Sequence, residues 1–159
     1  MRRKDKEIKD GAAIRRIIEK AGICRLGLCR DNVPYIVPVC FGYDGKSLYF
    51  HTAREGMKID YIAANNRVCF ELEDEVEAVP NDSACEWSFS FYSVIGFGTV
   101  EELTDPTLQA RALGWIMKHY SNREWDFSGR SFENMRVWRI HIDQMTGKKS
   151  KDKPLPLQV

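Results

Sequence analysis

One stretch, residues 86–103, constrains the fold more than any other part of this 159-residue sequence. It reads EWSFSFYSVIGFGTVEEL, and its aromatic side chains alternate at Trp87, Phe89 and Phe91. An alternation with a period of two is typical of a β-strand. Gly96 and Gly98 lie within the strand, which indicates a bend or a β-bulge. A long strand that bends in its middle favours a small antiparallel barrel.

Other segments also have the character of strands, and they cover residues 23–29, 33–43, 47–51, 67–73 and 135–143. Asp44 and Gly45 form a strong hairpin signal between two of these strands. Pro34 and Pro38 cannot donate to a strand ladder, so part of their strand is expected at a sheet edge. Helical patterns predict three helices, which cover residues 6–21, 57–64 and a segment that starts at residue 104.

Six hairpin-linked strands with three helices predict a mainly β (α+β) chain. The architecture expected from them is a six-stranded antiparallel barrel with helices packed on its outside. The sequence shows no internal repeat and no linker-like change in composition. We therefore expect residues 1–159 to form one domain.

The charge balance argues against two classes of partner. Lys and Arg number 24 and Asp and Glu number 23, so the formal net charge is +1. A protein that binds nucleic acid usually carries a basic excess, and a protein that spans a membrane needs a long apolar run. The first residues, MRRKDKEIKD, lack the apolar centre of a signal peptide, so we expect a cytoplasmic location and no membrane.

The five cysteines form neither a metal-binding nor a disulfide pattern. Their spacing is irregular, and no C-x-x-C pair occurs. Zinc sites and disulfide frameworks of small domains usually show regular spacing or an even count. The sequence therefore predicts reduced thiols and no metal site.

Residues 50–58, FHTAREGMK, gather hydrogen-bond donors where a strand meets a helix. The side chains of Thr52, Arg54 and Lys58 can donate, and Gly56 lets a ligand approach the backbone closely. The first amides of a helix lack internal partners, and the helix dipole makes that end positive, so a phosphate cradle is one interpretation. The other interpretation is a capped helix whose basic residues only face solvent. Local chemistry alone leaves both open.

Three ordered blocks of the chain resemble one known family. The first block is PYIVPVCFGYDGKSLYFHTAREGMKIDYIAANNRVCFELE, with a proline-containing strand, an Asp-Gly hairpin, and His-Thr followed by Gly-x-Lys. The others are FYSVIGFGTVEEL and VWRIHIDQMTGKKS, the second of which resembles a closing strand with a Gly-Lys turn. The chain is similar to the pyridoxamine 5'-phosphate oxidase-like FMN-binding split barrels, and more narrowly to their nitroimidazole-resistance (Nim-like) branch.

This resemblance implies a homodimer with flavin mononucleotide (FMN) at the subunit interface. Flavin adenine dinucleotide (FAD) would use the same site by its flavin half. The residues implied to contact the cofactor are Val37, Pro38, Val39, Cys40, His51, Thr52, Arg54, Lys58, Ser93, Val94 and Lys148. Thr52, Arg54 and Lys58 are implied to hold the phosphate, while the backbone of residues 37–40 faces the polar edge of the isoalloxazine ring. Lys148 is implied to reach the flavin or the partner subunit.

The function implied is that of a flavin-dependent oxidoreductase that reduces a small molecule, such as a nitroaromatic 5-nitroimidazole. His51 would be the catalytic residue, because it would lie beside the flavin ring and donate a proton or a hydrogen bond. A flavin-binding protein without turnover stays open. So does a pyridoxamine phosphate oxidase-type enzyme, since Arg139 and His141 match a fragment of its signature. The loop with Trp125 and Phe127 is expected either to cap a flat substrate or to anchor itself on the surface.

Overall fold

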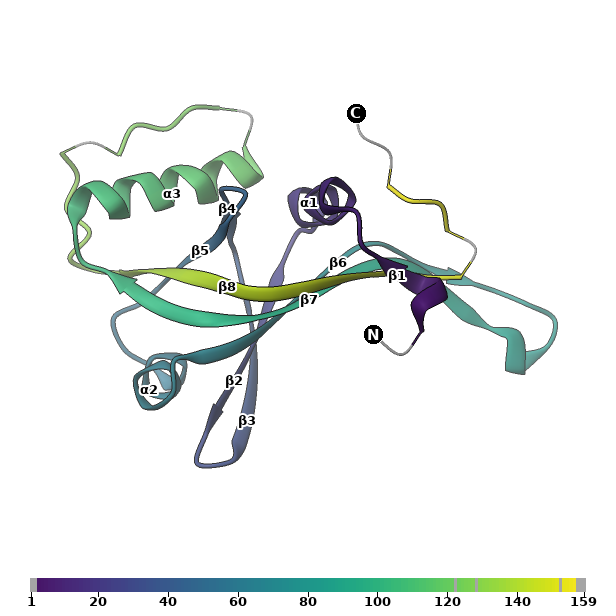
Figure 1. Cartoon of the computed structure of the whole chain (residues 1–159). Helices are drawn as coiled ribbons and strands as arrows, with labels where there is room; N and C mark the ends of the chain where they lie inside the picture. Colours follow the sequence, from purple (N-terminus) through teal and green to yellow (C-terminus); the bar gives the residue numbers. More distant parts are fainter. Residues whose placement is uncertain (1–2, 122, 128, 152, 157–159) are drawn as a thin grey trace.

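The computed structural model describes residues 3–121, 123–127, 129–151 and 153–156, and within them the chain forms one antiparallel sheet with three α-helices (Figure 1). The sheet has eight strands in the order β3-β2-β6-β7-β8-β5-β4, with β1 paired to the end of β8. The strands are β1 (Glu7–Ile8), β2 (Cys24–Arg30), β3 (Val33–Val39), β4 (Gly42–Tyr43), β5 (Ser47–Thr52), β6 (Arg67–Val79), β7 (Ser88–Leu103) and β8 (Arg136–Lys149). The helices are α1 (Gly11–Lys20), α2 (Met57–Ala64) and α3 (Pro106–Tyr120), with 3-10 turns η1 (Lys4–Lys6) and η2 (Ala84–Glu86).

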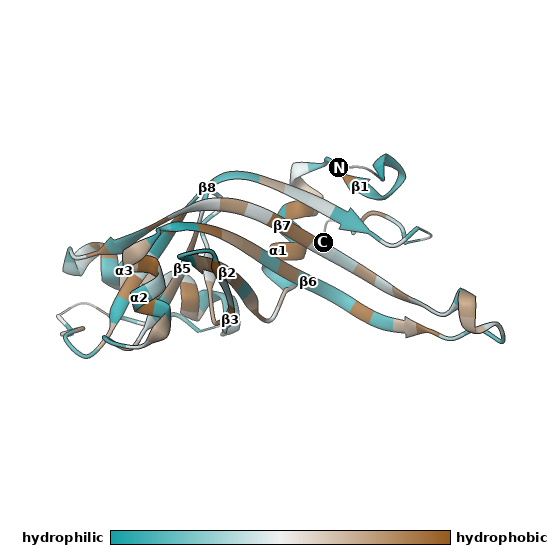
Figure 2. Ribbon diagram, turned by 90° about the horizontal axis from the view of Figure 1, so that it is seen from below, coloured by the Kyte–Doolittle hydropathy of each residue, from teal (hydrophilic) through white to brown (hydrophobic). Residues whose placement is uncertain are grey.

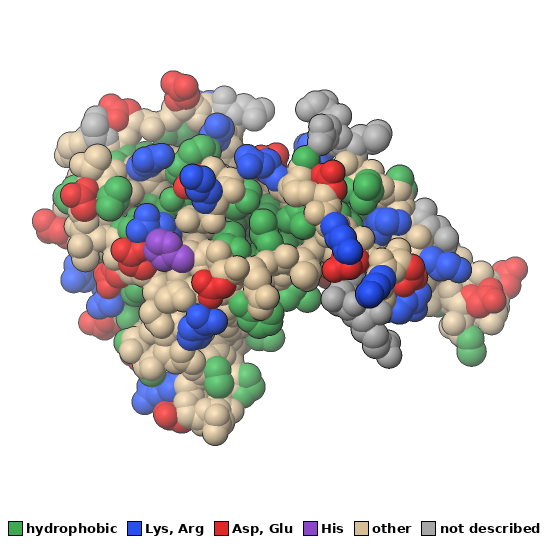
Figure 3. Space-filling view, in the orientation of Figure 1, with side chains coloured by type: hydrophobic (Ala, Val, Ile, Leu, Met, Phe, Trp, Pro, Cys, Tyr) green, Lys and Arg blue, Asp and Glu red, His purple; other side chains and the backbone are tan. Residues whose placement is uncertain are grey.

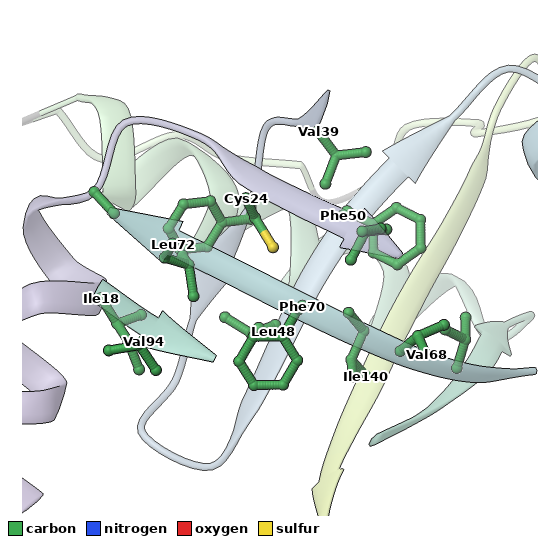
Figure 4. Packing of buried hydrophobic residues seen from close by; sticks show 14 of the residues in the cluster. Ile18, Cys24, Val39, Leu48, Phe50, Val68, Phe70, Leu72, Val94 and Ile140 are labelled. Atoms are coloured by element: carbon green, nitrogen blue, oxygen red, sulfur yellow. The ribbon is translucent and has the colours of Figure 1, made fainter. Parts of the chain in front are cut away.

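The sheet coils until its two edges share one core. Val39 of the edge strand β3 and Phe50 of β5, the strand next to the opposite edge, are both buried in the same cluster as Phe70 of β6. Figure 4 shows these side chains gathered between the strands. The predicted antiparallel split β-barrel with flanking helices is therefore confirmed. The sheet has more strands than the six predicted, because β1 and β4 are short additions.

The two glycines of β7 allow the sheet to bend. A Cβ atom on Gly96 would overlap the ring of Phe70 on β6, and one on Gly98 would overlap the backbone of His141 on β8. The register between β7 and β8 shifts between Phe97 and Gly98. The predicted bulge is confirmed, and glycine is needed there because neighbouring atoms fill the space of a side chain.

Two helices pack on the barrel through separate apolar clusters. α1 buries Ile14, Ile17 and Ile18 against the main core. α3 buries Leu113 and Ile116 in a second cluster, which it forms with the outer faces of β5, β7 and β8. Part of the outer face of β5 is thus covered by α3, and the end of the strand stays uncovered.

The predicted strand over residues 33–43 is split in two. Its first part is β3 and its last part is β4, because β3 pairs with β2 whereas β4 pairs with β5. Cys40 and Phe41 carry the chain from one strand pair to the other. The edge position expected from Pro34 and Pro38 is confirmed, since β3 is the first strand in the sheet order.

Three other boundaries differ from the prediction. The first helix begins later, at Gly11, because the carboxylate of Asp10 accepts a hydrogen bond from the amide of Ala13 and caps the helix there. β6 runs past its predicted end to Val79. β8 continues to Lys149, so the Gly-Lys pair expected in a turn lies within the strand, where β1 and β7 both pair with it.

The ends of β6 and β7 leave the barrel as a long arm, residues 74–91 (Figure 2). The arm exposes four large apolar side chains, namely Val76, Val79, Trp87 and Phe89. Over the rest of the face shown in Figure 3, acidic and basic side chains are intermingled. Among the described residues, no helix combines the length and the apolar character that crossing a membrane requires.

Candidate functional site

The last two residues of β5 face opposite sides of the barrel wall. Phe50 points into the core, so Thr52 points inwards and His51 outwards. Thr52 is 7% exposed, and its hydroxyl donates to the carbonyl of Ala53 at 2.7 Å while it accepts from Trp138 Nε1 at 3.0 Å. A hydroxyl has one proton to donate. The hydroxyl of Thr52 therefore has no proton left to donate to a phosphate in this arrangement.

His51 and Lys58 lie close enough for the charge of one to affect the other. Burial lowers the pKa of the His51 imidazole below its ordinary 6.5, and the nearby ammonium of Lys58 lowers it further. Burial also lowers the pKa of Lys58 from its ordinary value. Near neutral pH, His51 is therefore a neutral imidazole beside a cationic side chain. An anion placed near Lys58 would reduce the cost of keeping that charge half-buried.

The helix α2 begins differently from the other two α-helices. The carboxylates of Asp10 and Asp105 cap α1 and α3, whereas Gly56 precedes α2 and no described side chain caps that helix. Gly56 has φ 126° and ψ 165°, a backbone conformation that only glycine adopts readily. Apart from its two neighbours in the chain, no atom of the described residues lies within 4 Å of where its Cβ would be. The amides of Ile59 and Asp60 donate to the carbonyl of Gly56, so within the described part of the chain the amides of Met57 and Lys58 are the ones left to an anion.

Arg54 reaches a different part of the chain. Its guanidinium donates a hydrogen bond to the carbonyl of Glu133, in the loop before β8. Arg54 also lines a cavity of about 310 Å³, whose wall includes Arg130 and Arg136. Neither arginine was predicted, because Arg130 lies in the loop before β8 and Arg136 begins β8, and no local pattern connects either position with the end of β5.

The residues expected beneath the flavin ring lie where the chain crosses from β3 to β4. Val39 is buried and Val37 is half-buried against the core, whereas Pro38 and Cys40 are exposed. The crossing leads into β4, which pairs with β5. It therefore approaches the strand that carries His51, and the structure brings these two parts of the predicted site towards each other.

Ser93, Val94 and Lys148 form a second group, which lies in the first half of β7 and at the end of β8. Ser93 pairs with Lys148, whereas His51 pairs with Val137, which lies eleven residues earlier on β8. At a rise of about 3.3 Å per residue, the two positions are separated by roughly 36 Å of strand. The side chain of Val94 is 0% exposed, so it can offer only backbone groups. One chain does not bring this group to His51.

Arg139 and His141 are bound to an acidic neighbour. Arg139 Nη2 and His141 Nε2 each lie 2.6 Å from Glu101 Oε2. The guanidinium of Arg139 and then the imidazole of His141 hold the pKa of Glu101 below its ordinary value. A substrate phosphate at these two side chains would have to compete with this carboxylate.

The aromatic loop before β8 is attached to the second apolar cluster. Phe127 packs against that cluster, near the helix α3. Trp125 is 45% exposed, and its indole N–H donates to Ser121 Oγ at 3.3 Å. The anchoring role is therefore supported for Phe127, while the ring of Trp125 remains open to solvent.

Comparison with known proteins confirms the predicted family resemblance. Residues 10–149 match the family model described as pyridoxamine 5'-phosphate oxidase. A crystal structure of a candidate 5-nitroimidazole antibiotic resistance protein from Bacteroides thetaiotaomicron is 35% identical, with a TM-score of 0.79 over 89% of this chain and 85% of the other. An uncharacterised protein of Rhizobium meliloti is 25% identical over 83% of this chain and 87% of its own length.

More distant structures share the fold. The FAD and haem binding protein of Mycobacterium smegmatis has a TM-score of 0.80 at 19% identity, covering 94% of this chain and 75% of the other. A FAD-binding protein of Mesorhizobium loti has a TM-score of 0.66 at 24% identity, covering 91% of this chain and 96% of the other. At such identities the likeness establishes the architecture alone.

Proposed function

Because the chain belongs to the pyridoxamine 5'-phosphate oxidase family, we propose that it binds a flavin and uses it to reduce nitroaromatic compounds, 5-nitroimidazoles among them. The observation that carries the proposal is the uncapped start of α2, with Gly56 before it, Lys58 in its first turn and His51 on the preceding strand. The similarity to a candidate 5-nitroimidazole antibiotic resistance protein suggests the class of substrate.

A flavin phosphate suits the chemistry at the start of α2. A phosphate needs several N–H donors and a positive potential, and free amides, the helix dipole and the ammonium of Lys58 would supply them. The exposed residues Pro38 and Cys40, on the chain that leads to β4, are then available to the ring. FMN carries every group that this set of residues recognises, and the flavin half of FAD carries the same groups.

His51 would act on the substrate rather than on the phosphate. A bound flavin supplies the electrons for the reduction. As a nitro oxygen gains negative charge, a neutral imidazole can donate a hydrogen bond to it through its N–H. The lowered pKa of His51 favours that neutral form near pH 7. Neighbouring groups remove part of the water around His51, which lowers its pKa, but the side chain keeps enough contact with solvent for its proton to be replaced from water.

A second copy of the chain would complete the site. Ser93 and Lys148 lie far along β8 from the position that pairs with His51. A flavin that contacts both groups therefore needs them from different subunits. This supports a homodimer with the flavin between its subunits.

The outer face of the barrel offers a surface for that dimer. Ile36 on β3 is 70% exposed and Phe97 on β7 is 45% exposed. Gly27 and Cys69 lie between them in one cross-strand row over β2 and β6. Exposed apolar side chains in one row across a sheet face are typical of an association surface. A two-fold axis through this row would bury it on both copies.

The two alternatives differ in their support. A pyridoxamine phosphate oxidase-type activity is less favoured, because Glu101 already pairs with Arg139 and His141. A flavin-binding protein without turnover shares every feature of the cradle, and only a measurement of electron transfer separates it from a reductase.

The experiment that tests the proposal follows electrons to a nitro compound. The purified protein should be yellow, should bleach when reduced anaerobically with one equivalent of dithionite, and should regain its colour when metronidazole is added. Reduced protein that metronidazole does not reoxidise would leave a flavin-binding protein without this activity. A colourless protein that takes up neither FMN nor FAD would refute flavin binding itself.

A further inference from the structure

A cavity of about 310 Å³ has Arg54, from the segment between β5 and α2, in its wall. It lies where β7 ends and β8 begins, and the loop that leads into α2 forms part of its wall. Arg54 belongs to that wall and precedes Gly56 by two residues. The cavity therefore begins close to the place where the phosphate of a bound flavin would lie.

The cavity combines guanidinium groups with an apolar floor. Its cationic side chains are Arg54, Arg130 and Arg136. Leu103 and Phe132, which are 3% and 8% exposed, supply buried apolar surface on another part of the wall. Guanidinium groups bind phosphate oxygens in pairs of hydrogen bonds, and an apolar wall accepts the face of a base.

The positive charge of these arginines is only partly balanced. Arg136 Nη1 lies 3.5 Å from the carboxylate of Glu102, a long ion pair. The acceptor of Arg54 is the carbonyl of Glu133, which has no net charge. Arg130 lies 6.0 Å from the centre of the Phe127 ring. Glu102 and Glu133 also line the cavity, so its wall carries three basic and two acidic side chains.

We propose that this cavity takes the adenylate half of FAD, whose flavin half lies in the cradle at α2. This inference rests on the proposed flavin binding and assigns the cofactor within it. FAD places a second phosphate directly after the first, followed by a ribose and a purine. Arg54 and Arg130 hold the second phosphate, and the apolar wall receives the purine. The volume of the cavity falls at the lower end of the range for small-molecule sites.

The test compares the affinities of the apoprotein for FAD and for FMN, measured by quenching of flavin fluorescence. The native chain should bind FAD at least about tenfold more tightly than FMN, since the second phosphate gains charge-assisted hydrogen bonds. Arg130→Ala should remove most of that preference and leave the affinity for FMN within about twofold, because FMN has no group that reaches Arg130. The unchanged affinity for FMN also shows that the variant is folded.

Arg123→Ala is the matched control, since Arg123 lies on the same loop and is not among the residues that line the cavity. It should keep the preference for FAD. Equal affinities for FAD and FMN in the native chain, or a parallel loss of both in Arg130→Ala, would overturn this inference and leave the proposed function standing. Tight binding of AMP to the FMN-loaded protein would also overturn it, by making a separate nucleotide the occupant. A protein that binds neither flavin overturns both proposals.

Discussion

Replacing Gly56 with alanine tests the phosphate cradle through its backbone. Gly56 has φ 126° and ψ 165°, a conformation that other residues adopt only at a cost of about 1–3 kcal/mol. Beyond the adjacent residues, the described part of the chain has no atom within 4 Å of the new Cβ, so no steric clash with it adds to this cost. Alanine must either keep the strained backbone or move it, and a moved backbone would displace the first amides of α2.

We expect the unfolding free energy of apo Gly56→Ala, measured in urea, to fall by about 1–3 kcal/mol. Its affinity for FMN should fall as well, because the free amides no longer converge on the phosphate. Gly114→Ala is the control. Gly114 lies within α3, and outside the backbone of that helix no atom of the described residues lies within 4 Å of the new Cβ. Alanine there should stabilise the protein by up to about 1 kcal/mol.

Two results would refute this reasoning. A Gly56→Ala protein as stable as the native chain would show that this position does not require glycine. A destabilised protein with an unchanged affinity for FMN would show that the amides of α2 do not bind the phosphate, and the site would have to be sought elsewhere.

Three further predictions concern the charge, the interface and the pH response of the protein. Lys58→Ala should weaken FMN binding by about 1.5–3 kcal/mol, the scale of a hydrogen bond to a charged group. His51→Ala should instead keep FMN and slow the reoxidation of the reduced protein by metronidazole by about a hundredfold. An equal loss of FMN in both variants would place His51 in the phosphate cradle. Phe97→Asp should give a folded monomer that no longer retains flavin, as judged by sedimentation and absorbance, because it puts a charge into the apolar row; a flavin-loaded dimer would contradict this interface. Burial lowers the pKa of His119 below its unfolded value of 6.5, so the unfolded chain binds more protons and the protein should lose stability as pH falls below about 6.5. His119→Gln should reduce that loss in urea titrations at pH 7.5 and pH 5.5, and an unchanged loss would exclude a contribution from this histidine.

The sequence predicts the elements whose signals are local. The alternating side chains of β7 and its two glycines are sufficient to predict a bent strand. The turn at Asp44 can also be predicted from its own residues. The carboxylate of Asp44 accepts hydrogen bonds from the amides of Lys46 and Ser47, both at 2.8 Å. The candidate cradle is also local, since His51, Gly56 and the helix start follow one another. Antiparallel hairpins make such a fold easier to predict from its sequence, because strands that follow one another in the chain usually pair in the sheet.

Features that depend on distant contacts cannot be predicted in the same way. The hydroxyl of Thr52 is directed inwards by Trp138, a partner far along the chain. Gly147 and Lys148 have the local pattern of a turn, but they lie within β8 because β1 pairs with them. Arg136 comes near Arg54 because β8 pairs with β5, and Arg130, in the loop before β8, lines the same cavity. Each of these depends on tertiary packing, which local patterns do not encode.

Native mass spectrometry of the purified protein, after incubation with a mixture of FMN and FAD, tests the central claim most directly. That claim is that a flavin binds between two copies of this chain. The account predicts a dimer that carries two flavins, and it predicts that Lys58→Ala loses them under the same conditions. A monomer that retains a flavin would contradict the shared site, and a dimer that takes up no flavin would contradict the cradle.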